Sequence, residues 1–321
     1  MMSEILTSIS ARKTMRDVFI DQLYERMHEE KKLFFLSADF GSPALDKLRK
    51  KFKDRFINVG IAEQNLINVA TGLAKEGFDV YAYAIAPFLT MRAYEQIRVN
   101  LALFSQLETV NVNLIGVGAG ISYDVAGPTH HCLEDIAIMR VLPNMILFSP
   151  SDWVQAKKFV DYTIQVKKPK YIRFDGKPLP HIYDEAGPVD FSDGFSELRE
   201  GKKICLISTG YMTHVALKIA EQIEPAIGLI DVFMLNSIDE KKLFSAIKKY
   251  DVLITMEEGF VNKGGMDSLV AYILDDNCAS PVLRRIGFPE KYIFSVGNRD
   301  FLYQLNGIGE EAVMELIQGY I

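Results

Sequence analysis

The sequence predicts an α/β protein of two domains, each a mainly parallel sheet with helices on both faces. A length of 321 residues suits two domains better than one. Short β-rich runs alternate with helical patterns, which is typical of βαβ units. Between Lys167 and Gly201 the chain is rich in Pro, Gly and charged residues, as in a surface linker. We therefore place the domains at residues 10–180 and 190–321.

Each domain has its own series of expected elements. The strands expected in the first domain are residues 32–40, 56–60, 79–85, 110–118, 145–150 and 170–174, and the helices are 61–77, 90–104, 133–142 and 152–165. In the second domain we expect strands at 203–209, 227–233 and 252–256 and helices at 214–223, 239–247, 264–276 and 310–320.

Composition excludes several classes of function. The net charge is 36 − 42 = −6, whereas nucleic-acid-binding proteins usually need a basic face. The three cysteines are far apart, which gives no disulfide framework and no paired zinc spacing and favours a cytoplasmic location. We expect neither a signal peptide nor a membrane span. The hydrolase, nucleotide-triphosphatase and zinc-protease motifs GxSxG, GxxxxGK[ST] and HExxH are all missing from the sequence.

The segment VGIAEQN places a carboxylate at the start of a helix. Glu63, Leu66, Ala70 and Leu73 follow a helical period, so Glu63 is expected on the apolar, inward face. A buried carboxylate needs a partner or a proton. Two interpretations stay open at this point: a first-turn Glu that interacts with the helix dipole, or a carboxylate whose partner is a ligand.

Two further stretches carry candidate residues. Phe88, Met91 and Tyr94 form an apolar stripe at helical spacing, which is either core or an aromatic surface for a flat heterocycle. The segment GPTHH brings His130 and His131 into a glycine-rich loop beyond a strand end, where substrates bind in α/β folds. Adjacent side chains diverge, so the two histidines are not expected to share a metal.

Taken in order, SADF, VGIAEQN, RAYEQIR, GPTHH and RVLPNMILFSPSD resemble the C-terminal half of transketolases, especially the split form whose halves are separate chains. In the second domain, LISTGYMTHVALKIAEQI, MEEGFVNKGG and IGFPEKYIFSVGN are similar to the last domain of transketolases and deoxyxylulose-phosphate synthases. The resemblance covers residues 10–318.

This resemblance implies thiamine diphosphate chemistry and gives the residues roles. Glu63 would hydrogen-bond the aminopyrimidine ring and exchange a proton with it, and Phe88 would stack on that ring, with Met91 and Tyr94 in the same pocket. His130 would bind the ketose oxygens and stabilise charge. The remaining residues that the resemblance places near the cofactor are Asp39 and Phe40, and those that it places near the substrate are His131, Asp124, Ser42 and Arg173.

The sequence departs from the family at the substrate loop. Ala126 stands where transketolases carry an aspartate that contacts a substrate hydroxyl, and Gly118 stands roughly where they carry a histidine. Asp124 is the nearest carboxylate that could compensate. Arg173 is followed by Phe174 and Asp175 rather than by the sequence of a phosphate-gripping arginine. These departures predict ketol transfer on a non-standard sugar.

The resemblance also implies a partner chain. The GDG…N pattern that holds Mg²⁺ and the diphosphate is missing from the sequence, so an N-terminal, diphosphate-binding subunit would supply those ligands in an α₂β₂ assembly with this chain as β. Two alternatives remain open: a decarboxylating subunit similar to deoxyxylulose-phosphate synthase or to the beta subunit of 2-oxo-acid dehydrogenases, and an inactive regulatory subunit.

Overall fold

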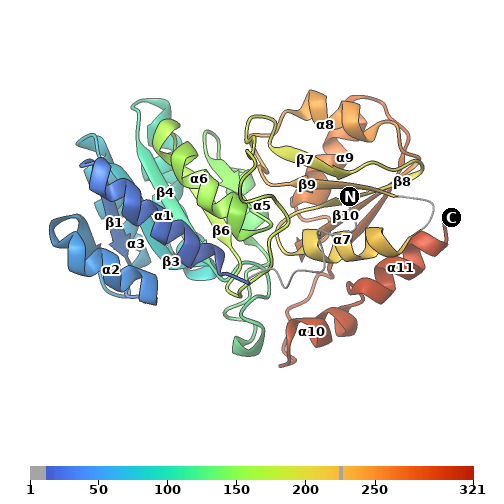
Figure 1. Cartoon of the computed structure of the whole chain (residues 1–321), viewed down its shortest axis with the longest axis horizontal. Helices are drawn as coiled ribbons and strands as arrows, with labels where there is room; N and C mark the ends of the chain where they lie inside the picture. Colours follow the sequence, from blue (N-terminus) through green and yellow to red (C-terminus); the bar gives the residue numbers. More distant parts are fainter. Residues whose placement is uncertain (1–11, 224–226) are drawn as a thin grey trace.

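The computed structural model describes residues 12–223 and 227–321 as two α/β domains that lie side by side (Figure 1). The sheet of the first domain is entirely parallel, in the order β2-β1-β3-β4-β6-β5. Its strands are β1 (Leu33–Ser37), β2 (Phe56–Asn58), β3 (Asp79–Ile85), β4 (Asn111–Val117), β5 (Ile146–Phe148) and β6 (Lys170–Phe174). The predicted fold class is confirmed.

Helices cover both faces of this sheet, because the buried strands have apolar side chains on both faces. One face packs against α1, α2 and α6, and the other packs against α3, α5 and the segment around α4. The helices are α1 (Met15–Glu29), α2 (Pro43–Lys51), α3 (Glu63–Lys75), α4 (Tyr94–Gln96), α5 (Asp135–Arg140) and α6 (Trp153–Gln165). Helices α1 and α6 lie side by side across the front of the view (Figure 1).

The helix expected at residues 90–104 is present but interrupted. Residues Phe88–Arg92 and Ile97–Leu103 form π-helical turns on either side of the short α4. The Thr90 hydroxyl donates to the Ala86 carbonyl at 2.8 Å within the first of these turns. Such wide turns are rare in proteins as a whole, but those that occur are frequently at functional sites. This segment is therefore a candidate part of the active site.

The second domain has a five-stranded sheet in the order β11-β10-β8-β9-β7. Its strands are β7 (Phe195–Arg199), β8 (Ile204–Ser208), β9 (Gly228–Val232), β10 (Val252–Phe260) and β11 (Val282–Phe288). Its helices are α7 (Met212–Gln222), α8 (Glu240–Ile247), α9 (Met266–Asp276), α10 (Arg299–Asn306) and α11 (Glu310–Gln318). Strand β7 is antiparallel to β9 and lies inside the stretch expected to be a linker, which corrects that expectation.

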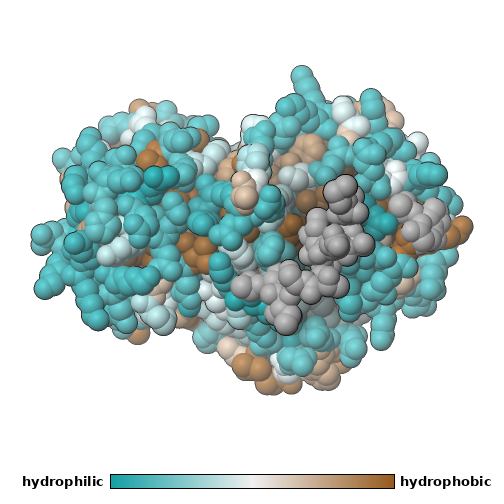
Figure 2. All heavy atoms as spheres, in the orientation of Figure 1, coloured by the Kyte–Doolittle hydropathy of each residue, from teal (hydrophilic) through white to brown (hydrophobic). Residues whose placement is uncertain are grey.

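The surface of the second domain carries an apolar patch on α10 and on the segment before it. Its exposed members are Tyr292, Phe294, Val296, Phe301 and Leu305. Figure 2 shows hydrophobic atoms at the lower end of the second domain, where α10 lies in Figure 1. The visible face of the first domain is mostly hydrophilic. Within residues 12–223 and 227–321, no helix is long and apolar enough to cross a membrane.

Candidate active site

The candidate residues converge because neighbouring strands end at the same edge of the sheet. Asp39 follows β1, Glu63 follows β2, Phe88 follows β3 and the loop of His130 follows β4. These four strands are adjacent and parallel in the order β2-β1-β3-β4. The carboxyl ends of parallel strands form the usual binding crevice of α/β folds, so the sheet itself brings the four segments together.

Glu63 is the first residue of α3 and is buried there, as the helical period predicts. Gly60 makes the turn from β2 with φ +77°, a conformation that favours glycine. The Glu63 side chain is only 7% exposed, and its Oε1 accepts a hydrogen bond from Arg92 Nη1 at 3.1 Å. Both interpretations of Glu63 thus have a physical basis here, since it lies at a helix N-terminus and it also faces a nitrogen donor.

Arg92 contacts both Glu63 and Phe88. It was not identified as a site residue from the sequence. Its guanidinium carbon lies 3.9 Å from the centroid of the Phe88 ring, while the same group donates to Glu63. A planar nitrogen donor therefore stacks on Phe88 and hydrogen-bonds Glu63 at the same time. These are the two contacts that an aminopyrimidine ring needs, so the residues present fit that part of thiamine diphosphate.

His130 also contacts Phe88. The two rings are edge to face with centroids 5.1 Å apart, and His130 Nδ1 is 3.1 Å from the Thr129 hydroxyl. His131 is buried, with Nε2 3.4 Å from the Asp124 carbonyl, and burial lowers its pKa. The structure therefore presents His130 toward the aromatic surface and holds His131 inside the loop.

Met91 and Tyr94 differ in their exposure to solvent. Met91 is 40% exposed. Tyr94 is partly buried against the core, and its hydroxyl donates to the Ile138 carbonyl of α5 at 2.8 Å. The apolar stripe thus contains one side chain available to a ligand and one that packs against the protein.

Asp39, Phe40 and Ser42, which follow β1, have mainly structural contacts. Asp39, at φ +53°, exchanges two hydrogen bonds with Asn58 at the end of β2. Phe40 stacks on Tyr83 with centroids 5.3 Å apart. Ser42 caps α2 by accepting from the backbone N–H of Leu45 at 3.4 Å.

Arg173 and Asp124, which the resemblance places near the substrate, are both engaged in ion pairs within the protein. Arg173 is 3% exposed, and its Nε donates to Asp135 Oδ2 at 2.8 Å. Asp124 is also buried and pairs with Lys177. Both charges already have partners inside the protein, and sequence spacing gives no sign of pairs so far apart along the chain.

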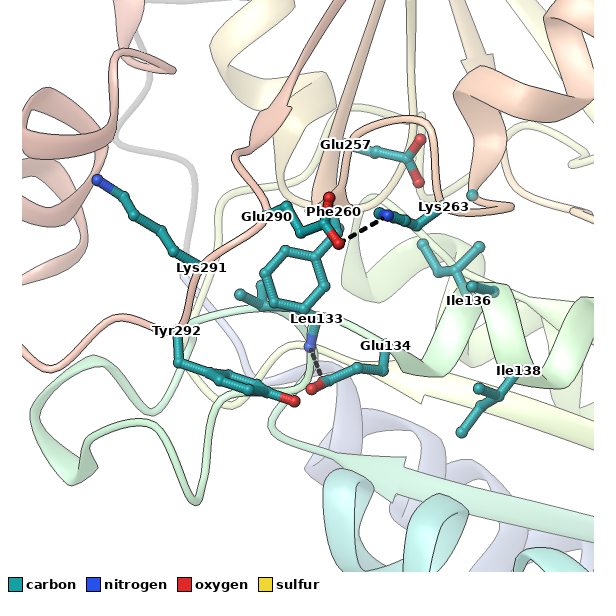
Figure 3. A pocket seen from close by; sticks show the side chains of 13 residues that line it. Leu133, Glu134, Ile136, Ile138, Glu257, Phe260, Lys263, Glu290, Lys291 and Tyr292 are labelled. Atoms are coloured by element: carbon teal, nitrogen blue, oxygen red, sulfur yellow. Dashed lines mark hydrogen bonds and ion pairs between the residues drawn. The ribbon is translucent and has the colours of Figure 1, made fainter.

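A pocket of about 440 Å³ lies between α5 and the second domain (Figure 3). Glu134 accepts from the Leu133 backbone N–H at 3.0 Å on one side, and Lys263 pairs with Glu290 at 2.8 Å on the other. Its described lining residues do not include Glu63, Phe88 or His130. The candidate site is thus distinct from this pocket.

The acidic and histidine side chains of residues 12–223 and 227–321 form no candidate metal site. Among the described residues, no group of three or more His, Cys, Asp or Glu side chains is arranged to hold a metal ion. The buried acids near the candidate site are paired instead with cations, as Glu63 is with Arg92 and Asp135 with Arg173.

Comparisons with known proteins agree with this geometry. The family model of the transketolase pyrimidine-binding domain matches residues 11–180, and that of the transketolase C-terminal domain matches residues 195–313. One subunit of the apulose-4-phosphate transketolase of Actinobacillus succinogenes is 36% identical over 273 residues, which are 83% of this chain and 85% of that protein.

Two further relatives extend over nearly the whole chain. The 6-deoxy-6-sulfo-D-fructose transketolase subunit of a Clostridium species is 29% identical over 94% of this chain and 92% of its own length. A solved split-gene transketolase, an inactive beta4 tetramer, superimposes with a TM-score of 0.84 at 31% identity and covers 95% of this chain and 97% of its own. The chain therefore belongs to the transketolase family, whose members are transferases, and it corresponds to the C-terminal, or beta, subunit of the split two-chain enzymes.

Proposed function

We propose that this chain is the pyrimidine-binding half of a thiamine diphosphate-dependent enzyme that transfers a ketol unit from a ketose to an aldose. The observation that carries the proposal is the continuous contact from Glu63 through Arg92 and Phe88 to His130. Arg92 is half exposed on a long side chain, so it can leave the Phe88 face when a flat heterocycle takes its place.

The chain's own residues have distinct tasks in this proposal. When bound, thiamine diphosphate supplies the nucleophilic carbon that attacks the ketose. Glu63 holds or releases a proton at its carboxylate, and burial at a helix N-terminus keeps that group away from bulk water. Phe88 and Met91 provide the apolar face that orients the ring. His130 donates to an oxygen of the sugar as the carbon–carbon bond breaks.

We propose that the diphosphate and Mg²⁺ are held by an N-terminal partner subunit in an α₂β₂ assembly. Mg²⁺ prefers oxygen ligands, and the described residues contain no cluster of acidic or histidine side chains arranged for a metal. The solved split-gene relative is an inactive beta4 tetramer, which supports the expectation that beta chains without their partner do not turn over substrate.

We propose a ketose other than the common pentose phosphate as donor. Val125 and Ala126 are exposed at the loop that carries His130, where the family usually has a carboxylate. The two named relatives act on unusual sugars, an apulose phosphate and a sulfonated deoxyfructose. Loss of a charged acceptor weakens binding of the usual hydroxyl, because the site cannot replace that hydrogen bond.

Titration calorimetry of the cofactor with Mg²⁺ tests the two-chain proposal. We expect tight binding and ketol transfer only after the chain has been combined with its diphosphate-binding partner. The matched control is the His130→Ala variant in the same complex, which should bind the cofactor like the wild type but lose turnover. Tight binding together with full activity in the isolated chain would overturn the proposal.

Two further points remain proposals. We keep the domain bounds at 10–180 and 190–321, which the two sheets and the two family matches support. We also keep a cytoplasmic location, supported by Cys132, Cys205 and Cys278, which are all free thiols in the structure.

A further inference from the structure

We infer that the second domain positions His130, through a hydrogen bond from the backbone N–H of Arg299 to the carboxylate of Asp124. The inference rests on the proposed role of His130. Arg299 begins α10 of the second domain, and Asp124 lies in the loop between Gly118 and Leu133 that carries His130, here called the histidine loop. The N–H to Oδ2 distance is 2.8 Å, and both side chains are buried.

The histidine loop is closed at its base by internal hydrogen bonds, as where the Cys132 backbone N–H donates to the Gly120 carbonyl at 2.7 Å, but its tip is exposed. Its regular structure consists of the 3-10 turn Asp124–Ala126 and an antiparallel bridge between Gly120 and Cys132. Val125, Ala126 and Thr129 are exposed. The base of the loop is buried, since Ile121 and Leu133 belong to the hydrophobic core of the second domain, so the exposed tip is the part that depends on polar anchors for a fixed position.

Those anchors come from two places, and the first is the parent domain. Lys177 donates to the Asp124 carboxylate, and the Gly176 backbone N–H donates to the Ser122 hydroxyl at 3.1 Å. Both donors lie just after β6, in the same domain as the loop. These two hydrogen bonds hold the part of the loop that contains Ser122 and Asp124 against the edge of its own sheet.

The second domain supplies the other anchors. Glu258 Oε1, at the end of β10, accepts from the Ile121 backbone N–H at 3.4 Å. A Cβ on Gly120 would come within 2.0 Å of the same carboxylate, so the two segments are in direct contact. The Arg299 N–H then fixes the turn that leads to His130.

The charges around Arg299 hold the donor rigidly. Its Nη2 donates to Asp175 Oδ2 at 2.6 Å, its Nε lies 3.2 Å from Glu258 Oε1, and its guanidinium carbon lies 3.8 Å from the Tyr211 ring centroid. Burial alone would raise the pKa of Asp124, but the Lys177 ion pair and the Arg299 N–H hold it below the usual value. The acceptor is thus ionised at neutral pH, and a hydrogen bond to an ionised acceptor is among the stronger ones.

Because the donor is a backbone group at the first position of a helix, it can be removed separately from the side chain. Proline is well tolerated at this position, and the preceding Asn298 already has the extended conformation that a proline requires (φ −71°, ψ 166°). Arg299→Ala and Arg299→Pro both lose the guanidinium, but only the proline variant loses the N–H that reaches Asp124. Their difference therefore isolates this hydrogen bond.

The experiment compares the two variants in the wild-type background and in an Asp124→Ala background. Amide hydrogen exchange of residues 121–131 is measured in the full chain, and kcat and KM are measured in the complex with the partner subunit. We expect loop exchange about tenfold faster and kcat/KM about tenfold lower in Arg299→Pro than in Arg299→Ala. Both differences should disappear in the Asp124→Ala background, while exchange in α11 stays equal throughout.

Equal loop exchange in the two Arg299 variants would overturn the inference, and so would faster exchange with unchanged kcat/KM. If Arg299→Pro does not fold, Asp124→Asn, which keeps an acceptor oxygen, should retain most of the activity that Asp124→Ala loses. A complex without ketol transfer would refute the proposed function, whereas loop exchange, which needs no turnover, would still decide whether Arg299 holds the loop.

Discussion

Replacing Glu63 by Gln should abolish turnover. It should leave the fold nearly unchanged, because the ion pair of this carboxylate with Arg92 is weak. Its partner Arg92 is 50% exposed, and pairs with such a screened member contribute about 0 to 1 kcal/mol. Gln is isosteric and keeps an oxygen to accept from Arg92. For a chain of this size, the midpoint of thermal unfolding should therefore move by only a few degrees.

The loss of activity should be much larger. Removal of an acid–base group usually costs about 100- to 10,000-fold in rate, and Gln can no longer exchange a proton with the cofactor ring. The assay is ketol transfer by the complex with its partner subunit, at a cofactor concentration that saturates the variant. Thermal unfolding of the isolated chain is followed at one fixed protein concentration, because association shifts the midpoint.

Asp135 offers a matched control within the same domain. It is also a buried carboxylate paired with an arginine, but here both partners are inaccessible, at 0% and 3% exposure for Asp135 and Arg173. Replacing Asp135 by Asn leaves a buried guanidinium without its counter-charge, which should cost about 3 to 5 kcal/mol. If the Glu63 variant retained more than a tenth of the activity, or unfolded as readily as the Asp135 variant, the assignment of Glu63 would be wrong.

Three further outcomes can be checked. Ala126→Asp restores the carboxylate that the family carries, and it should raise activity on xylulose 5-phosphate relative to the native donor; unchanged relative kcat/KM values would remove the basis for the donor proposal. Arg140→Ala should destabilise the contact between the domains by about 3 kcal/mol or more, because its guanidinium donates to the carbonyls of Gly264 and Gly265 at 2.5 and 2.6 Å, as a denaturant titration would show. Burial raises the pKa of Glu257 from 4.5 to about 7, so the folded chain binds more protons than the unfolded chain between these values and the stability due to this group falls as the pH rises through that window. The Glu257→Gln variant should show a smaller fall in unfolding free energy between pH 5 and 7 than the wild type, and equal pH profiles would contradict this.

The sheet of the first domain was predictable because local pattern and burial agree there. Strands β3 and β4 are apolar runs bounded by polar turns, and the structure places them at the centre of the sheet. Strand β7 was not predictable in the same way. It is a short, partly exposed edge strand with the charged residues Glu197 and Arg199, and edge strands commonly resemble surface loops in composition.

The candidate site was predictable where a helical period reports burial. Glu63 lies on the inward face of α3 as that period requires. Arg92 was not identified because its contact with Glu63 joins residues 29 positions apart, on two different elements. The ion pair of Arg173 with Asp135 spans 38 positions for the same reason. Local spacing thus gives the face of an element but not the partner across it.

The contacts of Asp124 show whether it can replace the aspartate that the family carries at the position of Ala126. The sequence left open whether Asp124 takes over the substrate contact two residues away. In the structure its two oxygens already accept from Lys177, from the Arg299 backbone N–H and from the Val125 backbone N–H. This carboxylate is also buried, so it is engaged in holding the histidine loop and is not presented to a substrate hydroxyl. In the proposed function, the loop would present His130 to the substrate beside the exposed Val125 and Ala126, which favours a donor without a hydroxyl at that point.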